Sequence, residues 1–407
     1  MKRRFLFLQG VCSPFFARLA TGLQAAGHEI YKIHFNGGDL LYWGGKKGRW
    51  YRGSRDNLGS FLAECYQSWQ ISDQILFGDC RPLHQIALAQ GRKQGVRNHV
   101  FEEGYFRPHW LTLEREGVNG HSLLPRDPDW FRQQGERLPE VHTVAFTPSP
   151  FRVRAFHDVA YHLAGVGNPI LFPAYGTHAP VTAPVEYAGY LKRFARLAWI
   201  RKQQQQSLEA FITCRARYFL LPLQLNGDAQ IRHHSPFAHM GEVINLVLES
   251  FARHAPGGDK LVIKNHPLDM GLMDYEKIIH HAANRLGVAH RLLYLEEGEL
   301  SRLLGHALGV ITVNSTVGLA ALAMGSPTLC LANPIYNLVG LTFQGKLDDF
   351  WLNRTPPDAT LFRLFQKVVM HTSQVNGGLY GQQEMALAVT GSLPRLTAEH
   401  SPLEMLT

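Results

Sequence analysis

The sequence predicts an α/β protein that folds as two Rossmann-like lobes with a central cleft. The chain has 407 residues, which is more than one hydrophobic core usually organises. Short apolar runs alternate with helical patterns near both ends of the chain, and this alternation indicates two series of βαβ units with parallel strands. Ligands of such sheets bind beyond the carboxyl ends of the strands, so polar residues that follow predicted strands are the candidates for a functional site.

The first βαβ series lies in an N-terminal lobe, predicted over residues 1–140. Its first helix, at residues 14–26, carries apolar side chains on one side and ends at Gly27, a residue suited to a helix terminus. Further helices are predicted at residues 58–68 and 83–90. Strands are predicted at residues 5–9, 29–34, 73–77 and 96–101.

The second series predicts a C-terminal lobe over residues 216–357, followed by C-terminal helices over residues 358–407 that can pack back on the N-terminal lobe. The predicted strands lie at residues 218–225, 260–264, 291–295, 309–313 and 328–331. The predicted helices lie at residues 240–253, 274–286, 300–306, 315–324 and 360–370. Proline-punctuated helical patterns between the lobes predict a connecting, membrane-proximal segment at residues 141–215.

The formal net charge of +8 suits acidic small molecules or an anionic membrane surface, whereas no nucleic-acid recognition module is present in the sequence. Much of the excess lies at residues 191–217, where seven Lys and Arg residues face only Glu209 and alternate with Phe194, Trp199 and other apolar residues. Two interpretations are open: a solvated helix face, or a peripheral contact with a membrane.

Several classes of protein lack support in the sequence. The apolar run at residues 5–8 is too short for the core of a secretion signal, and no apolar stretch reaches the roughly 20 residues of a membrane span. The five cysteines are scattered without a CxxC pair, which favours free thiols in a cytoplasmic protein. No zinc-ligand spacing, GxxxxGK[ST] loop or GxSxG elbow occurs, so we expect no metal site, P-loop or esterase nucleophile.

In the N-terminal lobe, two carboxylates follow a predicted strand. Glu102 and Glu103 precede Gly104, which permits a tight turn, and Arg107 follows. Adjacent residues of an extended segment point to opposite sides, so one of the two glutamates can face a given substrate. The alternative is a pair of surface acids at the start of a loop. Three further cleft candidates are Gln9, Asn36 and Asp39.

In the C-terminal lobe, polar clusters follow three predicted strands. The first holds Asp228, a carboxylate that suits a nucleophile held by hydrogen bonds, although Asn-Gly-Asp is also ordinary turn chemistry. In the second, Pro267 favours an extended backbone at His266, which can aim the imidazole and Lys264 out of the sheet end towards a phosphate. In the third, Ser315 begins a helix whose first amides form an anion site or a simple N-cap. The remaining members of these clusters are Gln224, Gln230, Asn314 and Thr316.

Long segments of the chain resemble capsule-polysaccharide proteins of the KpsS/LipB type. The matching segments include FGDCRPLH, FEEGYFRPHW, LQLNGDAQIRHHSPF, VIKNHPLD, ITVNSTVGLAAL and NPIYNLVGLTFQGKLDDFW. The resemblance implies a GT-B-like fold and a retaining β-Kdo transferase that uses CMP-Kdo as donor and a phosphatidylglycerol-type lipid as acceptor. It also implies a peripheral location on the inner face of the cytoplasmic membrane, alongside a KpsC-like transferase and the capsule export complex, with no cofactor.

At the matching motifs, the resemblance implies that Glu103 is the acid/base and that Asp228 is the nucleophile. It implies that the CMP phosphate and ribose are bound by His266 with Asn314, Ser315 and Thr316. Two other functions stay open: a non-catalytic component of the capsule export machinery that binds the glycolipid, and a GT-B enzyme acting on a UDP-sugar.

Overall fold

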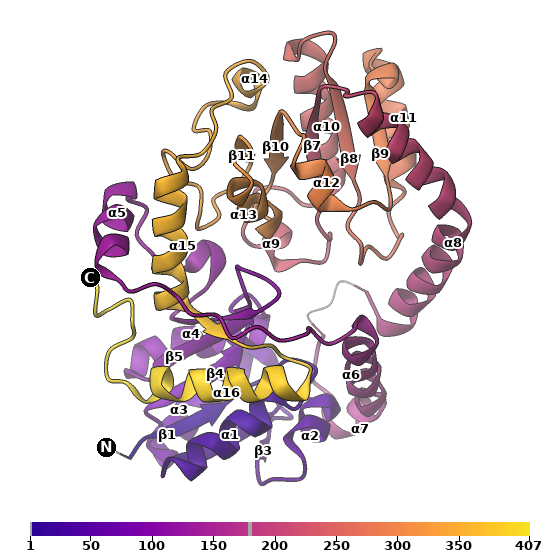
Figure 1. Ribbon diagram of the computed structural model, residues 1–407. Helices are drawn as coiled ribbons and strands as arrows, with labels where there is room; N and C mark the ends of the chain where they lie inside the picture. Colours follow the sequence, from indigo (N-terminus) through magenta and orange to yellow (C-terminus); the bar gives the residue numbers. More distant parts are fainter. Residues whose placement is uncertain (1, 178–180) are drawn as a thin grey trace. The chain divides into compact units, whose positions relative to one another are not determined.

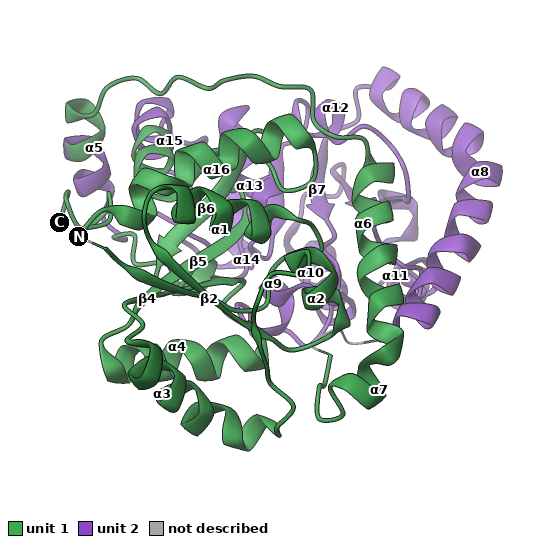
Figure 2. Cartoon of the chain, turned by 90° about the horizontal axis from the view of Figure 1, so that it is seen from below, with its two compact units in different colours: residues 1–125, 134–178, 366–407 green, residues 126–133, 179–365 purple. Residues whose placement is uncertain are grey.

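The computed structural model describes residues 2–177 and 181–407. The chain divides into two units, coloured separately in Figure 2. Unit 1 contains residues 1–125, 134–178 and 366–407, and unit 2 contains residues 126–133 and 179–365. Each unit is an α/β fold around a sheet of its own, which confirms the predicted pair of Rossmann-like folds.

Unit 1 has a seven-stranded sheet in the order β12-β6-β5-β4-β1-β2-β3. The strands from β5 to β3 are parallel, whereas β6 is antiparallel to both β5 and β12. This antiparallel edge is absent from the sequence prediction. The strands are β1 (Arg4–Phe7), β2 (Glu29–His34), β3 (Arg49–Trp50), β4 (Asp73–Phe77), β5 (Arg97–Glu103), β6 (Trp110–Arg115) and β12 (Gln374–Asn376).

Helices cover both faces of the unit 1 sheet. One face packs on α1 (Phe15–Ala25) and α16 (Gln382–Thr397), and the other on α3 (Leu58–Trp69) and α4 (Pro82–Gln94). Phe5 and Phe7 of β1 lie in the first core and Leu6 in the second, as the alternation of side chains along a strand requires. The other helices are α2 (Gly37–Trp43), α6 (Phe151–Ala164), α7 (Asn168–Leu171), η1 (Arg55–Asn57), η2 (Asn119–His121) and η3 (Gly165–Gly167).

Unit 2 has a parallel five-stranded sheet in the order β11-β10-β7-β8-β9. Its strands are β7 (Tyr218–Pro222), β8 (Lys260–Lys264), β9 (Leu292–Leu295), β10 (Gly309–Thr312) and β11 (Thr328–Cys330). Its helices, seen in Figure 1, are α8 (Ala183–Thr213), α9 (Ala229–Arg232), α10 (Met240–His254), α11 (Tyr275–Leu286), η4 (Ala289–Arg291), α12 (Leu300–Leu304), α13 (Thr316–Ala323) and α14 (Leu347–Phe350).

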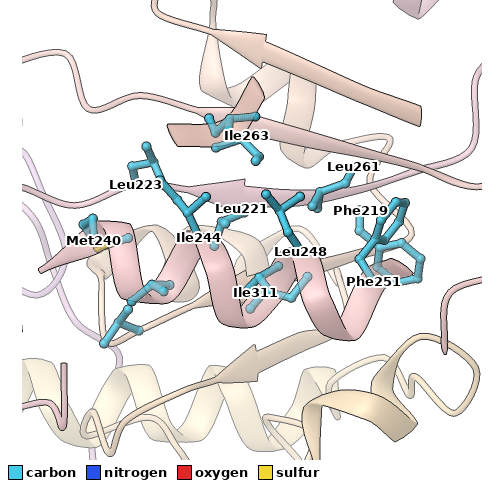
Figure 3. Packing of buried hydrophobic residues seen from close by; sticks show 14 of the residues in the cluster. Phe219, Leu221, Leu223, Met240, Ile244, Leu248, Phe251, Leu261, Ile263 and Ile311 are labelled. Carbon is cyan, nitrogen blue, oxygen red and sulfur yellow. The ribbon is translucent and has the colours of Figure 1, made fainter. Parts of the chain in front are cut away.

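The core of unit 2 forms where α10 packs on the sheet. Met240, Ile244 and Leu248 recur at helical spacing and face the strands, as Figure 3 shows. They meet Leu221 of β7 and Ile263 of β8, and all five side chains are fully buried. Because these strands are covered on both faces, their sequences consist of nearly continuous apolar residues. This pattern made their positions predictable from the sequence.

The units divide the chain at different positions from those expected. The segment predicted as a connector, residues 141–215, is shared: α6, η3 and α7 belong to unit 1, and α8 belongs to unit 2. Residues 366–407 belong to unit 1, where β12 pairs with β6 and α16 packs on α1. The helices α5 (Pro128–Arg137) and α15 (Ala359–Ser373) each cross the division between the units.

Within the described part of the chain, no helix combines the length and the apolar character needed to cross a membrane.

Two glycines allow α2 to approach α6 closely. A Cβ atom at Gly37 would lie 2.0 Å from the carbonyl oxygen of Ala164, and one at Gly38 would lie 2.4 Å from ring atoms of Tyr161. Real Cβ atoms do not approach other atoms so closely, and neither a hydrogen-bonded tyrosine ring nor a backbone carbonyl can move away freely.

We expect Gly38→Ala to lower the free energy of unfolding by about 1–3 kcal/mol, because the added methyl group overpacks the contact with Tyr161. The control is Gly59→Ala in α3, where the nearest atom to an added Cβ lies 3.8 Å away. Alanine there should leave stability unchanged or raise it by up to about 1 kcal/mol, since alanine favours helix. Urea denaturation of both variants measures the difference, and equal destabilisation would contradict the packing argument.

Candidate functional site

The two sheets share one topological feature. In unit 1 the chain order reverses between β1 and β4, and in unit 2 it reverses between β7 and β10. In open α/β sheets, ligands bind beyond the carboxyl ends of the strands at such a reversal. The carboxyl edges of the two sheets at these reversals are therefore the expected positions of functional residues, one edge in each unit.

In unit 2, two buried side-chain amides join the ends of β7 and β10. Gln224 donates from Nε2 to Oδ1 of Asn314 at 3.0 Å, and the backbone amide of Asn314 donates to Oε1 of Gln224 at 3.2 Å. Asn314 also donates from Nδ2 to the carbonyl oxygens of Gln230 (2.8 Å) and His234 (3.1 Å). Asn314 thus ties the segment after β7 to the end of β10, and it lies at the predicted edge.

Asp228 lies in the same segment and is the N-cap of α9. Its Oδ1 accepts a hydrogen bond from the backbone amide of Gln230 at 3.0 Å, and the residue is half-buried. An N-cap carboxylate is held in one orientation by the helix that it begins. The turn interpretation and the candidate nucleophile are therefore compatible, since the cap fixes the direction of the carboxylate.

Ser315 and Thr316 begin α13 at the end of β10. Oγ of Ser315 accepts a hydrogen bond from the amide of Val317 at 3.2 Å, so Ser315 is an N-cap. Its carbonyl oxygen accepts a hydrogen bond from the hydroxyl group of Tyr336. A Cβ atom at Gly318 would lie 2.2 Å from that hydroxyl oxygen, so glycine makes room for Tyr336. The start of α13 is thereby held rigidly at the carboxyl edge of the sheet.

His266 and Pro267 follow β8, the strand beside β7. Nδ1 of His266 accepts a hydrogen bond from the amide of Leu268 at 3.0 Å. When the ring is neutral its proton is therefore on Nε2, which can donate. Candidate residues that follow β7, β8 and β10 thus meet along one edge of the unit 2 sheet.

Lys264 differs from the expectation that it would point towards a phosphate. It is buried, and its Nζ donates to the carbonyl oxygens of Asn265 at 2.8 Å and Glu296 at 3.2 Å. Burial and, to a smaller extent, the nearby charge of Arg193 lower the pKa of Lys264 to about 8, against the opposing effect of Glu297 and Glu296. Its ammonium group holds the ends of β8 and β9 together.

Arg193 of α8 holds the loop that carries His266. The buried guanidinium group donates to the carbonyl oxygens of His266 (3.0 Å), Pro267 (2.8 Å) and Asp269 (2.6 Å). The same helix and loop enclose a pocket of about 250 Å³, lined by charged side chains that include Arg196, Asp269 and Glu296. None of the predicted site residues lines this pocket.

Part of the basic segment at residues 191–217 is engaged in internal contacts. Besides Arg193, Arg196 pairs with Glu276 and Glu296, and Arg201 pairs with Glu297 at 2.7 Å. These partners were not predictable from the sequence pattern, because Glu276, Glu296 and Glu297 come from elements far along the chain.

In unit 1, Glu103 ends β5 and is held between two guanidinium groups. Its Oε1 lies 3.1 Å from Nη1 of Arg154, and its Oε2 lies 3.7 Å from Nη1 of Arg107. Burial lowers the pKa of Arg154, but the charge of Glu103 and other acidic groups outweigh it and raise this pKa overall. Glu102 has a different role: its Oε1 accepts a hydrogen bond from the backbone amide of Glu103 at 3.0 Å.

Gln9, Asn36 and Asp39 also lie at the carboxyl edge of the unit 1 sheet, but they are engaged in internal hydrogen bonds. Gln9 and Asn36 donate to the hydroxyl group of Tyr161, at 2.9 and 2.8 Å, and Gln9 also donates to that of Tyr175 at 3.0 Å. Burial raises the pKa of Asp39, while Lys32, whose Nζ lies 3.9 Å away, opposes the shift. These residues attach α6 to the sheet edge.

Residues at the unit 1 reversal were missed by sequence reasoning. Asp79 follows β4, and its Oδ2 accepts hydrogen bonds from the amide of Val118 and from Nδ1 of His121, both at 3.0 Å. Arg81 donates to the carbonyl oxygen of Gly10 at 2.9 Å. The polar GDCR segment directly after a predicted strand was an available signal for both. No sequence signal indicated Arg154, which comes from a helix far along the chain.

Comparisons with known proteins identify relatives along most of the chain. The family model described as capsule polysaccharide biosynthesis protein matches residues 72–380. The capsule polysaccharide export protein KpsS of Escherichia coli is 35% identical over 379 residues, covering 93% of this chain and 97% of that protein. The capsule polysaccharide modification protein LipB of Neisseria meningitidis serogroup B is 34% identical over 387 residues, covering 93% of this chain and 91% of that protein.

A solved structure of KpsC from Thermosulfurimonas dismutans, described as a beta Kdo 2,7 transferase, aligns with 96% of this chain and 99% of that chain. The sequence identity is 13% and the TM-score is 0.46.

We expect Arg193→Met to lower the free energy of unfolding by about 2–4 kcal/mol, because three carbonyl groups of the His266 loop lose their donor. Arg201→Met, in the same helix, removes a solvent-exposed pair with Glu297 and should leave the denaturation midpoint nearly unchanged. Chemical denaturation monitored by circular dichroism compares the two variants. A tolerated Arg193→Met variant would show that the loop does not depend on this arginine.

Proposed function

This chain belongs to the capsule polysaccharide biosynthesis protein family, and from this premise we propose that it is a glycosyltransferase of the GT-B type. The proposed reaction transfers Kdo from CMP-Kdo to a phosphatidylglycerol-type lipid with retention of configuration. The observation that carries the proposal is the edge of the unit 2 sheet, where an aspartate, a histidine and a helix start gather at the reversal of strand order.

Unit 2 is proposed to bind the donor. The N-terminus of α13 carries partial positive charge, and it begins with Ser315 and Thr316 at the end of β10. His266 can donate from Nε2 to a phosphate oxygen. A CMP-sugar has a single phosphodiester charge, so a helix start and one imidazole donor can stabilise the departing CMP without a divalent metal.

Asp228 is proposed as the nucleophile of a double displacement. Its cap hydrogen bond restricts the carboxylate to one orientation, which suits attack on an anomeric carbon from the face opposite the leaving group. The resulting glycosyl-enzyme is then attacked by the acceptor hydroxyl group. Retaining glycosidases use a second carboxyl group in addition to the nucleophile.

The proposal assigns the second carboxyl group to Glu103. Arg154 and Arg107 pair with Glu103 as a carboxylate, and this suits a group that accepts the proton of the acceptor hydroxyl. CMP is a good leaving group, so a base is needed more than an acid.

The proposed setting is the inner face of the cytoplasmic membrane, with the protein bound peripherally alongside a KpsC-like transferase and the capsule export complex. The names of the relatives, an export protein and a modification protein, support a place in capsule assembly. Purified protein, CMP-Kdo and a short-chain phosphatidylglycerol acceptor test the activity directly, with the product detected by mass spectrometry. Absence of product with tight binding of the glycolipid would favour a non-catalytic export component.

We expect Asp228→Asn to lower kcat for Kdo transfer by at least about a thousandfold, because asparagine keeps the cap acceptor but loses the nucleophilic charge. Asp274 is a matched control, since its Oδ1 caps α11 by accepting from the amide of Lys277 at 3.0 Å. Asp274→Asn should leave kcat essentially unchanged. Near-normal turnover by Asp228→Asn would remove this residue from the mechanism.

We expect CMP to raise the melting temperature, because a ligand that binds only the folded state stabilises it, and UDP to raise it much less. Chelation with EDTA should change neither the shift caused by CMP nor the rate of transfer. Thermal-shift and transfer assays with and without EDTA measure both. Strict dependence on a divalent metal, or an equal shift with UDP, would favour an enzyme acting on a UDP-sugar.

A further inference from the structure

A stripe of large apolar side chains lies exposed on α6, η3 and α7 of unit 1. Phe156, Val159, Leu163, Val166 and Ile170 recur at intervals of three and four residues, the spacing of one face of a helix. Their exposed fractions are 69%, 40%, 67%, 74% and 78%. We call these five residues the α6–α7 stripe. Scattered exposed apolar residues are normal, but a contiguous row marks an interaction surface.

The opposite face of the same segment is firmly attached to unit 1. Tyr161 accepts hydrogen bonds from Gln9 and Asn36, and Oδ1 of Asn168 accepts from the amide of Gly37 at 2.8 Å. Nδ1 of His157 lies 2.8 Å from the hydroxyl oxygen of Tyr42. These polar contacts and the close approach to α2 fix the rotation of α6, so the side chains of the stripe stay exposed.

A basic loop adjoins one end of the stripe. It spans residues 46–55, and Arg52 donates from Nη2 to the carbonyl oxygen of Ile170 at 2.8 Å. Trp50, half-exposed, stacks on Phe172 with ring centroids 5.2 Å apart. Within the described residues, Lys47, Arg52 and Arg55 have no carboxylate at ion-pair distance. Their charges are therefore available to an anionic partner.

We propose that the α6–α7 stripe and the basic loop dock unit 1 on the surface of an anionic lipid bilayer. Apolar side chains on one helix face, with an aromatic residue and unpaired cations beside them, are the combination that lies in the membrane interface. The stripe extends about 20 Å, at 1.5 Å of rise per residue, so it can lie along the interface. A protein partner of ordinary interface chemistry would not require the excess of unpaired cations.

The inference rests on the proposed function in one respect: it locates the membrane contact that a lipid acceptor requires. It is an alternative to the membrane interpretation of residues 191–217. Arg193 is buried there, and Arg196 and Arg201 are paired. Within the described residues, Arg52 and Arg55 beside the α6–α7 stripe have no carboxylate at ion-pair distance.

Co-sedimentation with vesicles tests the proposal. We expect the protein to bind phosphatidylcholine vesicles that contain phosphatidylglycerol, to bind pure phosphatidylcholine more weakly, and to dissociate as ionic strength rises. Phe156→Ser with Leu163→Ser should lower the partition coefficient by roughly tenfold or more, because two large apolar groups no longer enter the interface. Lys47→Gln with Arg55→Gln should remove most of the preference for phosphatidylglycerol.

The matched control is Leu191→Ser with Trp199→Ser in α8, a pair with exposed fractions of 72% and 84%. This control should bind vesicles as the unsubstituted protein does. The proposal is overturned if the unsubstituted protein binds neither vesicle type, which would favour a protein partner, or if only the α8 pair loses binding. Unchanged binding by the Phe156 and Leu163 variant would overturn it as well.

The thermal shift caused by CMP separates this surface from the proposed activity. We expect the stripe variant to keep the shift of the unsubstituted protein, since the stripe lies in unit 1 and the donor is assigned to unit 2. If the protein binds vesicles through the stripe but transfers no Kdo, the docking surface is supported and the proposed transferase activity is ruled out.

Discussion

The hydrogen-bonded amide pair Gln224–Asn314 is the interaction on which the candidate donor site depends. It lies where β7 and β10 separate, and a buried amide without partners would cost roughly 1–3 kcal/mol. Asn314 satisfies its amide group by donating to the carbonyl oxygens of Gln230 and His234, so the segment after β7 is tied to the start of α13. Asp228 caps α9 in the segment after β7, and Ser315 caps α13 at the end of β10, so this connection joins the two segments that carry them.

Unit 1 uses buried polar contacts in a similar way to fix a helix. The hydroxyl group of Tyr161 receives hydrogen bonds from the ends of β1 and β2, and Gly37 and Gly38 allow α2 to pack against the same helix. Two consequences follow from one placement of α6. Arg154 on this helix reaches Glu103 at the end of β5, and the α6–α7 stripe faces outward. A helix that could rotate would provide neither, so the proposed base and the proposed lipid contact share one structural cause.

The positive charge of the protein is divided between internal and external uses. Lys264 donates to carbonyl oxygens at the ends of β8 and β9, and Arg193 donates to carbonyl oxygens of the loop that follows β8. Arg196 pairs with buried Glu296. These cations stabilise the loop that carries His266 and contribute little to the outer field. The cations of residues 46–55 lie on the surface of unit 1 instead. Net charge gives only the excess of cations over anions, whereas the partners of each cation decide whether it can attract an anion.

The sequence alone determined the α/β class, most of the parallel strands and the polar residues at their ends. The predicted bounds of β2, β4 and β8 agree with the structure. β8 is covered on both faces, and its central residues form a continuous apolar run. The antiparallel edge of unit 1 was decided by tertiary structure, since β12 pairs with a strand far away along the chain. The same holds for buried Arg193, for the pairing of Arg154 with Glu103, and for the outward face of α6. Periodicity along a chain shows that a helix has an apolar side, but only the packing of distant elements decides which sides are covered.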